Sequence, residues 1–188
     1  MEIIKTSIEE VVLIKPKVFE DTRGFFTETY RKDLFSGLGL YLDFVQDNHS
    51  GSVKNVLRGL HFQWEPAMGK LMRVTRGSAF LVAVDIRKNS PTLGSWYGKT
   101  ITSENRLQVW APYGFARGFC TLSDNVEIQY KCTGTYNGDC ESGISWNDPE
   151  VGIQWPVENP ILSEKDDNAQ TLREWLDSEQ SDNIIYKS

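Results

Sequence analysis

Histidine and cysteine are scarce in this chain of 188 residues, which contains two histidines and three cysteines. Cys120, Cys132 and Cys140 form no C-x-x-C pair, and an odd number suits neither a disulfide framework nor a zinc knuckle. The N-terminus, MEIIKTSIEE, lacks the basic and apolar regions of a secretory signal peptide. We therefore expect a cytoplasmic protein whose thiols stay reduced.

An excess of basic residues and long apolar runs are also missing. Lys and Arg number 20 against 26 Asp and Glu, so the formal net charge is −6. Nucleic acids and anionic membranes attract basic surfaces, and neither is an expected partner. The apolar run AFLVAV (79–84) is far shorter than the roughly 20 residues of a membrane-spanning helix. A small anionic ligand in a locally basic pocket is compatible with this composition.

The chain also has no internal repeat and no linker rich in Pro, Gly or Ser, so we expect one domain over residues 1–188. Its dominant hydrophobic period is two. VEIQYKC (126–132) alternates as a half-buried strand does, and SAFLVAVDIR (78–87) is apolar on both faces. GKTITSENRLQVWAP (98–112) has the pattern of strand, turn and strand. Short strands with regular turn signals predict an all-β sandwich or barrel.

Helices are expected to be few. The clearest one begins at Thr171, where TLRE is a capping box followed by Trp175 and Leu176. A shorter helix within RKDLFSGLG (31–39) would end at a glycine. The region from about residue 156 onward either packs back on the barrel or trails from it.

His61 lies in the strand-like run RGLHFQ (58–63). Strand alternation places His61 beside Gly59 on one face and Arg58 on the other, and the glycine leaves open space where a ligand can approach. Cations nearby, such as Lys70, favour a neutral imidazole at pH 7, which is suited to a base. A partly buried core histidine with one satisfied nitrogen is the structural alternative.

A metal site is not expected. Metal-binding β-barrels often use the pattern H-x-H, but here that position is occupied by His61, Phe62 and Gln63. His49 is the other histidine, so a three-histidine site is impossible. Tyr130 lies on the apolar face of its strand, where a core tyrosine and a general acid at a barrel mouth are both compatible with the pattern.

Arg23 in TRGFF and Arg117 in FARGF are flanked by glycine and aromatic residues. Guanidinium binds phosphate in a bidentate manner and stacks on rings, so either residue suits an anion clamp as well as a solvated surface. The chain has neither a P-loop nor a G-x-G-x-x-G motif, which argues against a nucleotide site at a helix N-terminus.

Taken together, these residues resemble the RmlC-type epimerases, a family that acts on nucleotide-linked 4-keto sugars and includes dTDP-4-dehydrorhamnose 3,5-epimerase. The matching stretches cover nearly the whole chain in order: DTRGFFTETY (21–30), VQDNHS (45–50), VLRGLHFQ (56–63), GKLMRVTRG (69–77), VAVDIRKNSPTLG (82–94), PYGFARGF (112–119), YKCTGTYN (130–137), GISWNDPEVGIQWP (143–156) and LSEKD (162–166).

The resemblance implies a cupin-type double-stranded β-helix, or jelly-roll barrel, that forms a homodimer and needs neither metal nor cofactor. Strands within about residues 1–50 would be shared with the partner, and about residues 160–188 would form a helical C-terminal segment. It also implies a reaction in which a base removes the acidic hydrogen beside a C4 ketone. An acid then returns a proton on the opposite face.

The roles that the resemblance implies fall on separate parts of the chain. His61 would be the base, Asp166 its orienting carboxylate, Tyr130 the acid, and Lys70 the cation near the enolate. The implied substrate-binding positions are Arg23, Phe26, Glu28, Gln46, Asn48, Arg58, Arg117, Tyr136, Glu141 and Lys165. Some of the nucleotide-binding positions would serve the neighbouring subunit's site.

One position departs from the family pattern, because Arg117 stands where the motif GFAHGF has histidine. Guanidinium cannot exchange protons near neutral pH, but it supplies a permanent cation. We predict a dTDP-4-dehydro-6-deoxyglucose 3,5-epimerase of deoxysugar biosynthesis. The alternatives are epimerisation at C3 or C5 alone, or keto-isomerisation, on a dTDP-, CDP- or GDP-linked sugar, and a sugar-nucleotide-binding barrel without catalysis.

Overall fold

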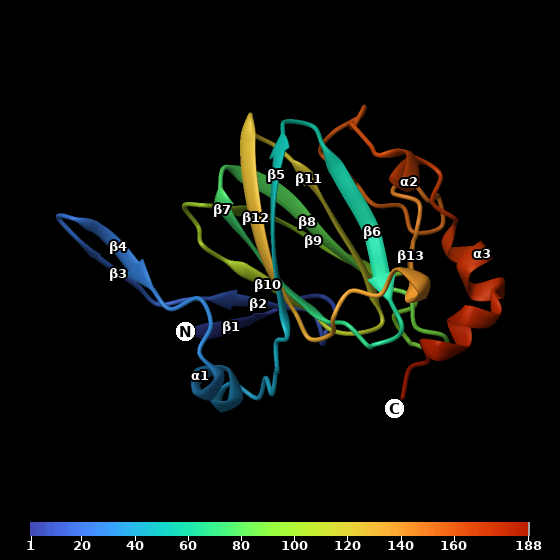
Figure 1. Ribbon diagram of the computed structural model, residues 1–188, viewed down its shortest axis with the longest axis horizontal. Helices are drawn as coiled ribbons and strands as arrows, with labels where there is room; N and C mark the ends of the chain where they lie inside the picture. The colour runs from blue at the N-terminus through green and yellow to red at the C-terminus, as the bar shows by residue number, and fades with distance from the viewer. Residues whose placement is uncertain (188) are drawn as a thin grey trace.

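The computed structural model describes residues 1–187, which form two large antiparallel sheets, a separate hairpin and several short helices (Figure 1). The six-stranded sheet contains, in spatial order, β1 (Glu2–Lys5), β2 (Val12–Lys15), β10 (Gln108–Ala111), β7 (Lys70–Arg76), β12 (Asn125–Cys132) and β5 (Gln46–Val53). The five-stranded sheet contains β13 (Glu141–Gly143), β6 (Leu57–Gln63), β11 (Phe115–Thr121), β8 (Ser78–Asp85) and β9 (Trp96–Thr102).

The expected all-β architecture is confirmed, and so are the individual strand patterns. The alternating run 126–132 lies within β12, and the doubly apolar run 78–87 contains β8. The predicted strand, turn and strand of 98–112 are also present as the end of β9 and the whole of β10. These two strands belong to different sheets, so the chain crosses between the layers at this turn.

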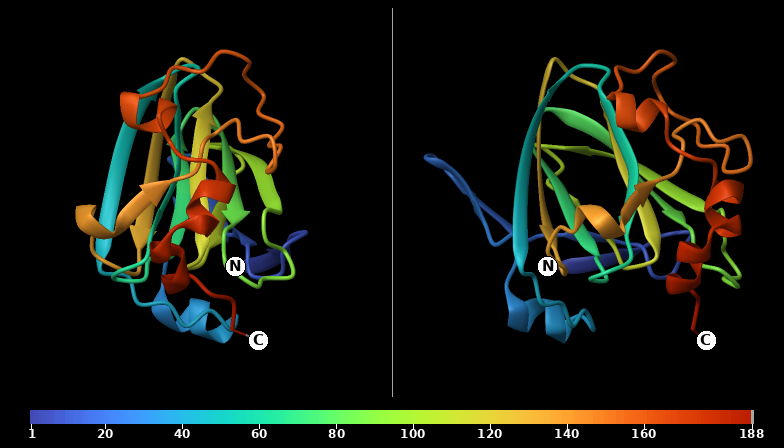
Figure 2. Two further views of the ribbon diagram at one scale, coloured as in Figure 1. Left: turned by 90° about the vertical axis from the view of Figure 1, so that its right-hand side faces the viewer. Right: turned by 45° about the vertical axis from the view of Figure 1, so that its right-hand side comes forward.

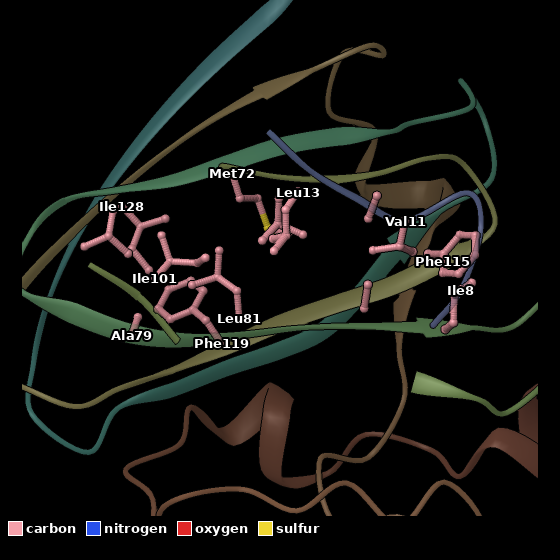
Figure 3. Close-up of a cluster of buried hydrophobic side chains, with 14 of the residues drawn as sticks. Ile8, Val11, Leu13, Met72, Ala79, Leu81, Ile101, Phe115, Phe119 and Ile128 are labelled. Carbon is pink, nitrogen blue, oxygen red and sulfur yellow. The ribbon is translucent and has the colours of Figure 1, made fainter. Parts of the chain in front are cut away.

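The main core fills the space between the two sheets (Figure 3). Alternate residues of each strand point inward, so Met72 and Ile128 of one sheet meet Leu81, Phe115 and Phe119 of the other. All five side chains are buried. Fully burying such a side chain stabilises the fold by about 1.5–3 kcal/mol, so this layer is what holds the sheets face to face.

A second core forms on the outer side of the five-stranded sheet, where the C-terminal segment packs against it (Figure 2). Outward-facing Leu60 and Phe62 of β6 pack in this cluster with Trp175 of helix α3 (Leu172–Asp177). The Phe62 and Trp175 rings are 4.5 Å apart in an edge-on arrangement. The chain after residue 156 therefore packs back on the barrel, as one of the two sequence interpretations states.

The two helices expected from the sequence are confirmed. Helix α3 starts at the predicted capping box, where Thr171 Oγ1 accepts from the Glu174 amide at 3.2 Å and the Glu174 carboxylate accepts from the Thr171 amide at 2.7 Å. Helix α1 (Lys32–Gly37) lies in the predicted stretch 31–39. The remaining short elements are α2 (Glu164–Asp167), η1 (Gly138–Cys140) and η2 (Glu179–Asn183).

A hairpin of β3 (Val18–Asp21) and β4 (Gly24–Thr27) projects away from the two sheets (Figure 1). Its aromatic side chains are largely uncovered: Phe19, Phe25 and Phe26 are 48%, 58% and 64% exposed. No helix within residues 1–187 has the length and apolar character needed to cross a membrane.

Candidate active site

A cavity of about 170 Å³ opens beside the main core, between the two sheets. Met72, Phe119 and Ile128 belong both to the core and to the cavity wall, so the hydrophobic layer forms one end of the cavity. The polar lining comes from both sheets and consists of Ser50, Arg58, His61, Lys70, Arg117 and Tyr130. Another hollow, of about 210 Å³, is lined by Arg73, Gln129 and their neighbours but not by His61.

His61, which lines this cavity, forms a short polar contact with Asp166, with 2.6 Å between Nε2 and Oδ1. Burial raises the pKa of Asp166, but the hydrogen bond and the charge of His61, together with the hydrogen bond from Ser163, lower it by more than burial raises it. The pKa of Asp166 therefore lies below its ordinary value. The carboxylate is therefore ionised and accepts from Nε2–H. This fixes the tautomer and leaves the lone pair on Nδ1, the arrangement that a general base needs.

Helix α2 presents Asp166, 105 residues after His61, to the end of β6. Ser163 caps this helix: its Oγ accepts from the Asp166 amide at 3.2 Å and donates to Asp166 Oδ2 at 2.9 Å. Ile161 ties the preceding segment to the barrel through backbone bonds to Asn55 and Leu57. Sequence reasoning missed Ser163, although the pattern S-x-x-D before a short helix is an N-cap signal.

The prediction that Arg58 and His61 occupy opposite faces of the strand is wrong, because both line the cavity. The β6–β11 register shifts between Arg117 and Phe119, and Gly59 has φ +119°. A Cβ on Gly59 would come within 2.6 Å of the Gly118 Cα, so only glycine fits this close crossing. The irregularity breaks the alternation of side chains along β6, so that Arg58 lies on the same face of the strand as His61 and shares the cavity with it.

Tyr130 and Lys70 lie on the opposite wall from His61, since β12 and β7 belong to the six-stranded sheet. The Lys70 Nζ lies 5.1 Å from the centre of the Tyr130 ring. Burial raises the pKa of Tyr130, an effect that Asn48, Arg58 and Arg117 oppose only in part. The phenol is therefore protonated at neutral pH and holds a proton on the wall of the cavity opposite His61.

Arg117 lies on β11 with its backbone in register with His61, and its side chain is 3% exposed. Its Nη1 donates to the Met68 carbonyl at 2.6 Å, while Nε is buried and has no hydrogen-bond partner among residues 1–187. The backbone carbonyl of Met68, two residues before Lys70, thus anchors the Arg117 side chain. The sequence does not signal this contact, because every residue has a backbone carbonyl. Arg117 is therefore a buried cation inside the cavity and not a surface residue.

Four further predicted positions, Gln46, Tyr136, Glu141 and Lys165, form a cluster beside the residues that line the cavity. Glu141 accepts from the Tyr136 hydroxyl at 2.8 Å and pairs with Lys165, the neighbour of Asp166 in α2. Burial raises the pKa of Glu141, but the bonds from Lys165 and Tyr136 outweigh it and leave the pKa low. The Gln46 side chain accepts from the Tyr136 amide at 2.8 Å. The cluster therefore links β5 of the six-stranded sheet with β13 of the five-stranded sheet.

Gln63, which stands at the second histidine position of the H-x-H pattern, holds a neighbouring loop through hydrogen bonds. Its amide donates to the Pro66 carbonyl at 2.8 Å and to the Thr135 carbonyl at 3.0 Å. Its oxygen accepts from the Asn137 amide at 2.9 Å. The buried side chain thus holds the loop that carries Tyr136.

Three predicted substrate-binding residues lie elsewhere. Arg23 and Phe26 belong to the projecting hairpin and Glu28 follows it, and none of them lines the cavity of this chain. Arg23 pairs with Asp21, and Glu28 pairs with Arg31 near α1. Of the ten predicted substrate-binding positions, Arg58 and Arg117 line the cavity, and Asn48 pairs with the cavity residue Tyr130. Gln46, Tyr136, Glu141 and Lys165 form the cluster described above.

The combination of a histidine–carboxylate pair, a protonated tyrosine on the opposite wall and cations in the cavity is suited to proton transfer on an anionic substrate. Comparison with known proteins defines the class. A family profile described as dTDP-4-dehydrorhamnose 3,5-epimerase matches residues 5–174. The chain belongs to this family of sugar-nucleotide epimerases, which are isomerases with a cupin-type fold.

Individual relatives agree with this assignment. The dTDP-4-dehydrorhamnose 3,5-epimerase of Shigella flexneri is 53% identical over 172 residues, covering 90% of this chain and 95% of the relative. A dTDP-4-dehydrorhamnose 3-epimerase of Streptomyces niveus is 38% identical, covering 95% and 87%. The crystal structure of RmlC from Legionella pneumophila in complex with dTDP-4-keto-L-rhamnose superposes with a TM-score of 0.93 at 43% identity, covering 100% and 99%.

Proposed function

We propose that this protein is a dTDP-4-dehydro-6-deoxyglucose 3,5-epimerase, which supplies a deoxysugar pathway of the rhamnose type. The observation that supports it best is the placement of His61 and Tyr130 on facing walls of one cavity. Inversion at a carbon requires removal of a proton from one face of the sugar and its return from the other. Two sheets that face each other supply the base and the acid from opposite sides without any movement of the chain.

The first step begins when His61 Nδ1 takes the hydrogen beside the C4 ketone. Asp166 holds the ring through Nε2 and stabilises the imidazolium that forms, since an ionised acceptor strengthens the bond. The electron pair of the broken C–H bond moves toward the C4 oxygen. Lys70 stands on the wall beside Tyr130 and stabilises the charge that develops there.

Tyr130 then returns a proton to the carbon from the opposite face. The same sequence at C3 and at C5 accounts for a double epimerisation, because a 4-ketone acidifies both positions. The reaction has no net oxidation or reduction, and we propose that it uses neither a cofactor nor a metal. Arg58 and Lys165 at the mouth bind the diphosphate, while Tyr136, Glu141, Gln46 and Asn48 line the path of the nucleotide-sugar.

The test is hydrogen exchange with solvent. In heavy water the protein should incorporate deuterium at C3 and C5 of dTDP-4-dehydro-6-deoxyglucose, as observed by NMR. His61→Asn should abolish exchange at both carbons, and full exchange in this variant would remove His61 as the base. CDP- and GDP-linked 4-keto sugars, tested in parallel, should react more slowly than the dTDP-linked sugar.

The same assay separates the competing functions. A relative named as a 3-epimerase is 38% identical to this chain, so epimerisation at C3 alone is the nearest alternative. Deuterium at one carbon would identify a mono-epimerase, and a moved carbonyl would identify a keto-isomerase. Binding without any exchange would identify a non-catalytic sugar-nucleotide-binding barrel.

We further propose a homodimer in which the hairpin β3–β4 completes the neighbour's site. The hairpin leaves its own two sheets and exposes Phe25 and Phe26, a pattern typical of surfaces that a partner covers (Figure 1). Arg23, Phe26 and Glu28 would then contact the nucleotide in the partner's cavity. This arrangement explains why they lie far from His61 within one chain.

Subunit complementation tests the exchange of hairpins. His61→Asn is one inactive parent, and the double variant Arg23→Ala and Phe26→Ala is the other. If each hairpin serves the partner, mixed dimers contain one intact site, and random mixing should restore activity to about a quarter of the sites. No restoration, with dimers confirmed by light scattering, would place the hairpin in its own subunit's site.

The location that we propose is the cytoplasm. Cys120, Cys132 and Cys140 are all free thiols, and two of them are buried. Unpaired thiols are typical of reducing compartments, where nucleotide-sugars are also at hand. Fractionation of cells that produce the protein, with a thiol-reactive probe to count free cysteines, tests this assignment.

A further inference from the structure

Arg117, which is buried, and Lys70, which is half-buried, are two cations that share one cavity. Among residues 1–187, no carboxylate forms an ion pair with either of them, and the one hydrogen bond of the Arg117 guanidinium goes to the Met68 carbonyl. Buried charge is costly unless it is paired or serves a ligand. The arrangement therefore points to an anion, or a developing negative charge, that arrives with the substrate.

The depth of Arg117 indicates which part of the substrate it serves. Arg117 is 3% exposed and in register with His61, whereas Arg58 and Lys165 are exposed at the mouth. The diphosphate must leave the cavity toward the nucleotide, so the mouth cations are the ones placed for it. Arg117 lies at the depth of the reacting carbons, beside the groups that exchange protons.

Titratable and charged groups face Lys70 from every element around it. They are Arg117 of β11, Tyr130 and Cys132 of β12, Glu141 of β13, His61 of β6 and Lys165 of α2. Burial is the largest influence and, together with the positive charge of Arg117, lowers the pKa of Lys70 to about 8. Burial also lowers the pKa of Arg117, but only to about 10, so Arg117 is charged whenever Lys70 is.

We propose that Arg117 is a positioning residue that acts through Lys70: its fixed positive charge makes Lys70 an acid, which passes a proton to the C4 oxygen as the enol forms. This role rests on the proposed epimerase function. In the step, His61 takes the C–H proton, the C–H electron pair becomes the C=C bond, and the carbonyl π pair takes a proton from Lys70 Nζ. The products are an enol, an imidazolium and a neutral amine, so charge is conserved.

Three variants at position 117 test the proposal. Arg117→Met removes the charge and the donors, Arg117→Gln removes the charge but keeps a donor, and Arg117→Lys keeps a cation. The matched control is Arg76→Gln, at the exposed end of the same strand as Lys70. Each protein is examined by the pH profile of solvent exchange, by dTDP binding, and by the pH titration of the Lys70 side chain, monitored by NMR of lysine labelled at Cε.

In the unaltered protein, activity should fall on the alkaline side near the pH at which Lys70 titrates. Both neutral variants should move this limb and the Lys70 titration upward by about one pH unit, because a neighbouring cation has been removed. Their exchange rate at pH 7 should fall by up to about 10-fold, since a pKa that is one unit higher weakens an acid catalyst by at most that factor. Arg117→Lys should recover part of the rate, and Arg76→Gln should match the unaltered protein.

Other outcomes would overturn the role. An unmoved Lys70 titration in both neutral variants would show that Arg117 does not act on Lys70. A loss of dTDP affinity equal to the loss of rate would make Arg117 a diphosphate ligand. The variants could also lose exchange because they unfold. If the Lys70 titration is then unmoved in Arg117→Lys and in the folded fraction of Arg117→Gln, Arg117 serves only as an anchor for Met68. Absence of exchange in the unaltered protein would overturn the proposed function as well, which distinguishes the two failures.

Discussion

Asp166→Asn is the change that isolates the electrostatic part of the histidine–carboxylate pair. Asparagine has nearly the same shape as aspartate, so its one side-chain oxygen still accepts from His61 Nε2, while its amide group takes the place of Oδ2 beside the Ser163 hydroxyl. The change removes the negative charge that stabilises the imidazolium after His61 takes a proton. We therefore expect substrate binding to persist while the rate of proton abstraction falls.

The size of the effect follows from the geometry. The contact is 2.6 Å long and Asp166 is 4% exposed, so solvent screens the pair weakly. Replacing a charge-assisted hydrogen bond by a neutral one costs about 1–1.5 kcal/mol. Full loss of the attraction between unit charges about 4 Å apart costs at most about 4 kcal/mol at an effective dielectric of 20. Because 1.36 kcal/mol is tenfold in rate, kcat should fall by about 10-fold to about 10³-fold.

The assay measures deuterium incorporation at C3 and C5 under saturating substrate, with dTDP affinity measured separately. The control is Asp167→Asn, an exposed carboxylate on the same short helix. An unchanged kcat in Asp166→Asn, or an equal loss in Asp167→Asn, would refute the reasoning.

Stability supplies a second readout. The pKa of Asp166 is lowered by folding, so its contribution is present above about pH 4 and is lost as pH falls. Asp166→Asn should show less of this acid destabilisation.

Three further changes should separate stability from activity. Lys70→Met should abolish exchange but raise the free energy of unfolding below about pH 8 by about 1–3 kcal/mol, because it removes a charge whose pKa burial lowers to about 8. Denaturant unfolding measures this gain, and a loss of stability would contradict it. Tyr130→Phe should reduce product about 10²-fold while solvent exchange persists in part, and an equal loss of both would argue against the acid role. Gly59→Ala should cost on the order of 2–4 kcal/mol, because φ is +119° and a Cβ would meet the Gly118 Cα at 2.6 Å. Thermal melting should show no such loss for Gly51→Ala, where the space is open.

The strands and their faces can be predicted from the sequence because a two-residue period is a local signal. Alternation along residues 126–132 puts Tyr130 on the apolar face, and in β12 this face is the one that lines the cavity. The same rule fails at Arg58, since alternation assumes a regular strand. The irregularity at Gly59 depends on the approach of β11, and β11 comes more than fifty residues later in the chain. Local periodicity contains no information on such a contact.

The grouping of the site residues does not follow from local patterns. Asp166 reaches His61 across 105 residues, and in the sequence only the resemblance to a family links the two. The anchoring of Arg117 on Met68 has no counterpart in the sequence, because every residue carries a backbone carbonyl. The geometry of the neighbour's hairpin is also absent from a single chain, so the placement of Arg23 beside a nucleotide stays a prediction.

The distribution of charge connects the composition with the proposed substrate. The chain has a formal net charge of −6, yet Arg58, Lys70 and Arg117 converge on one small cavity between the sheets. An acidic exterior repels nucleic acids and acidic membranes, whereas a positive cavity with low-dielectric walls concentrates a small anion. The same cations weaken the fold of the ligand-free protein, because burial disfavours the charged forms of Arg117 and Lys70 and no carboxylate among residues 1–187 pairs with either. A dTDP-sugar supplies the missing negative charge, so its binding should raise the melting temperature more in the unaltered protein than in Lys70→Met. Equal shifts in both proteins would show that the diphosphate alone, bound at the mouth, accounts for the stabilisation.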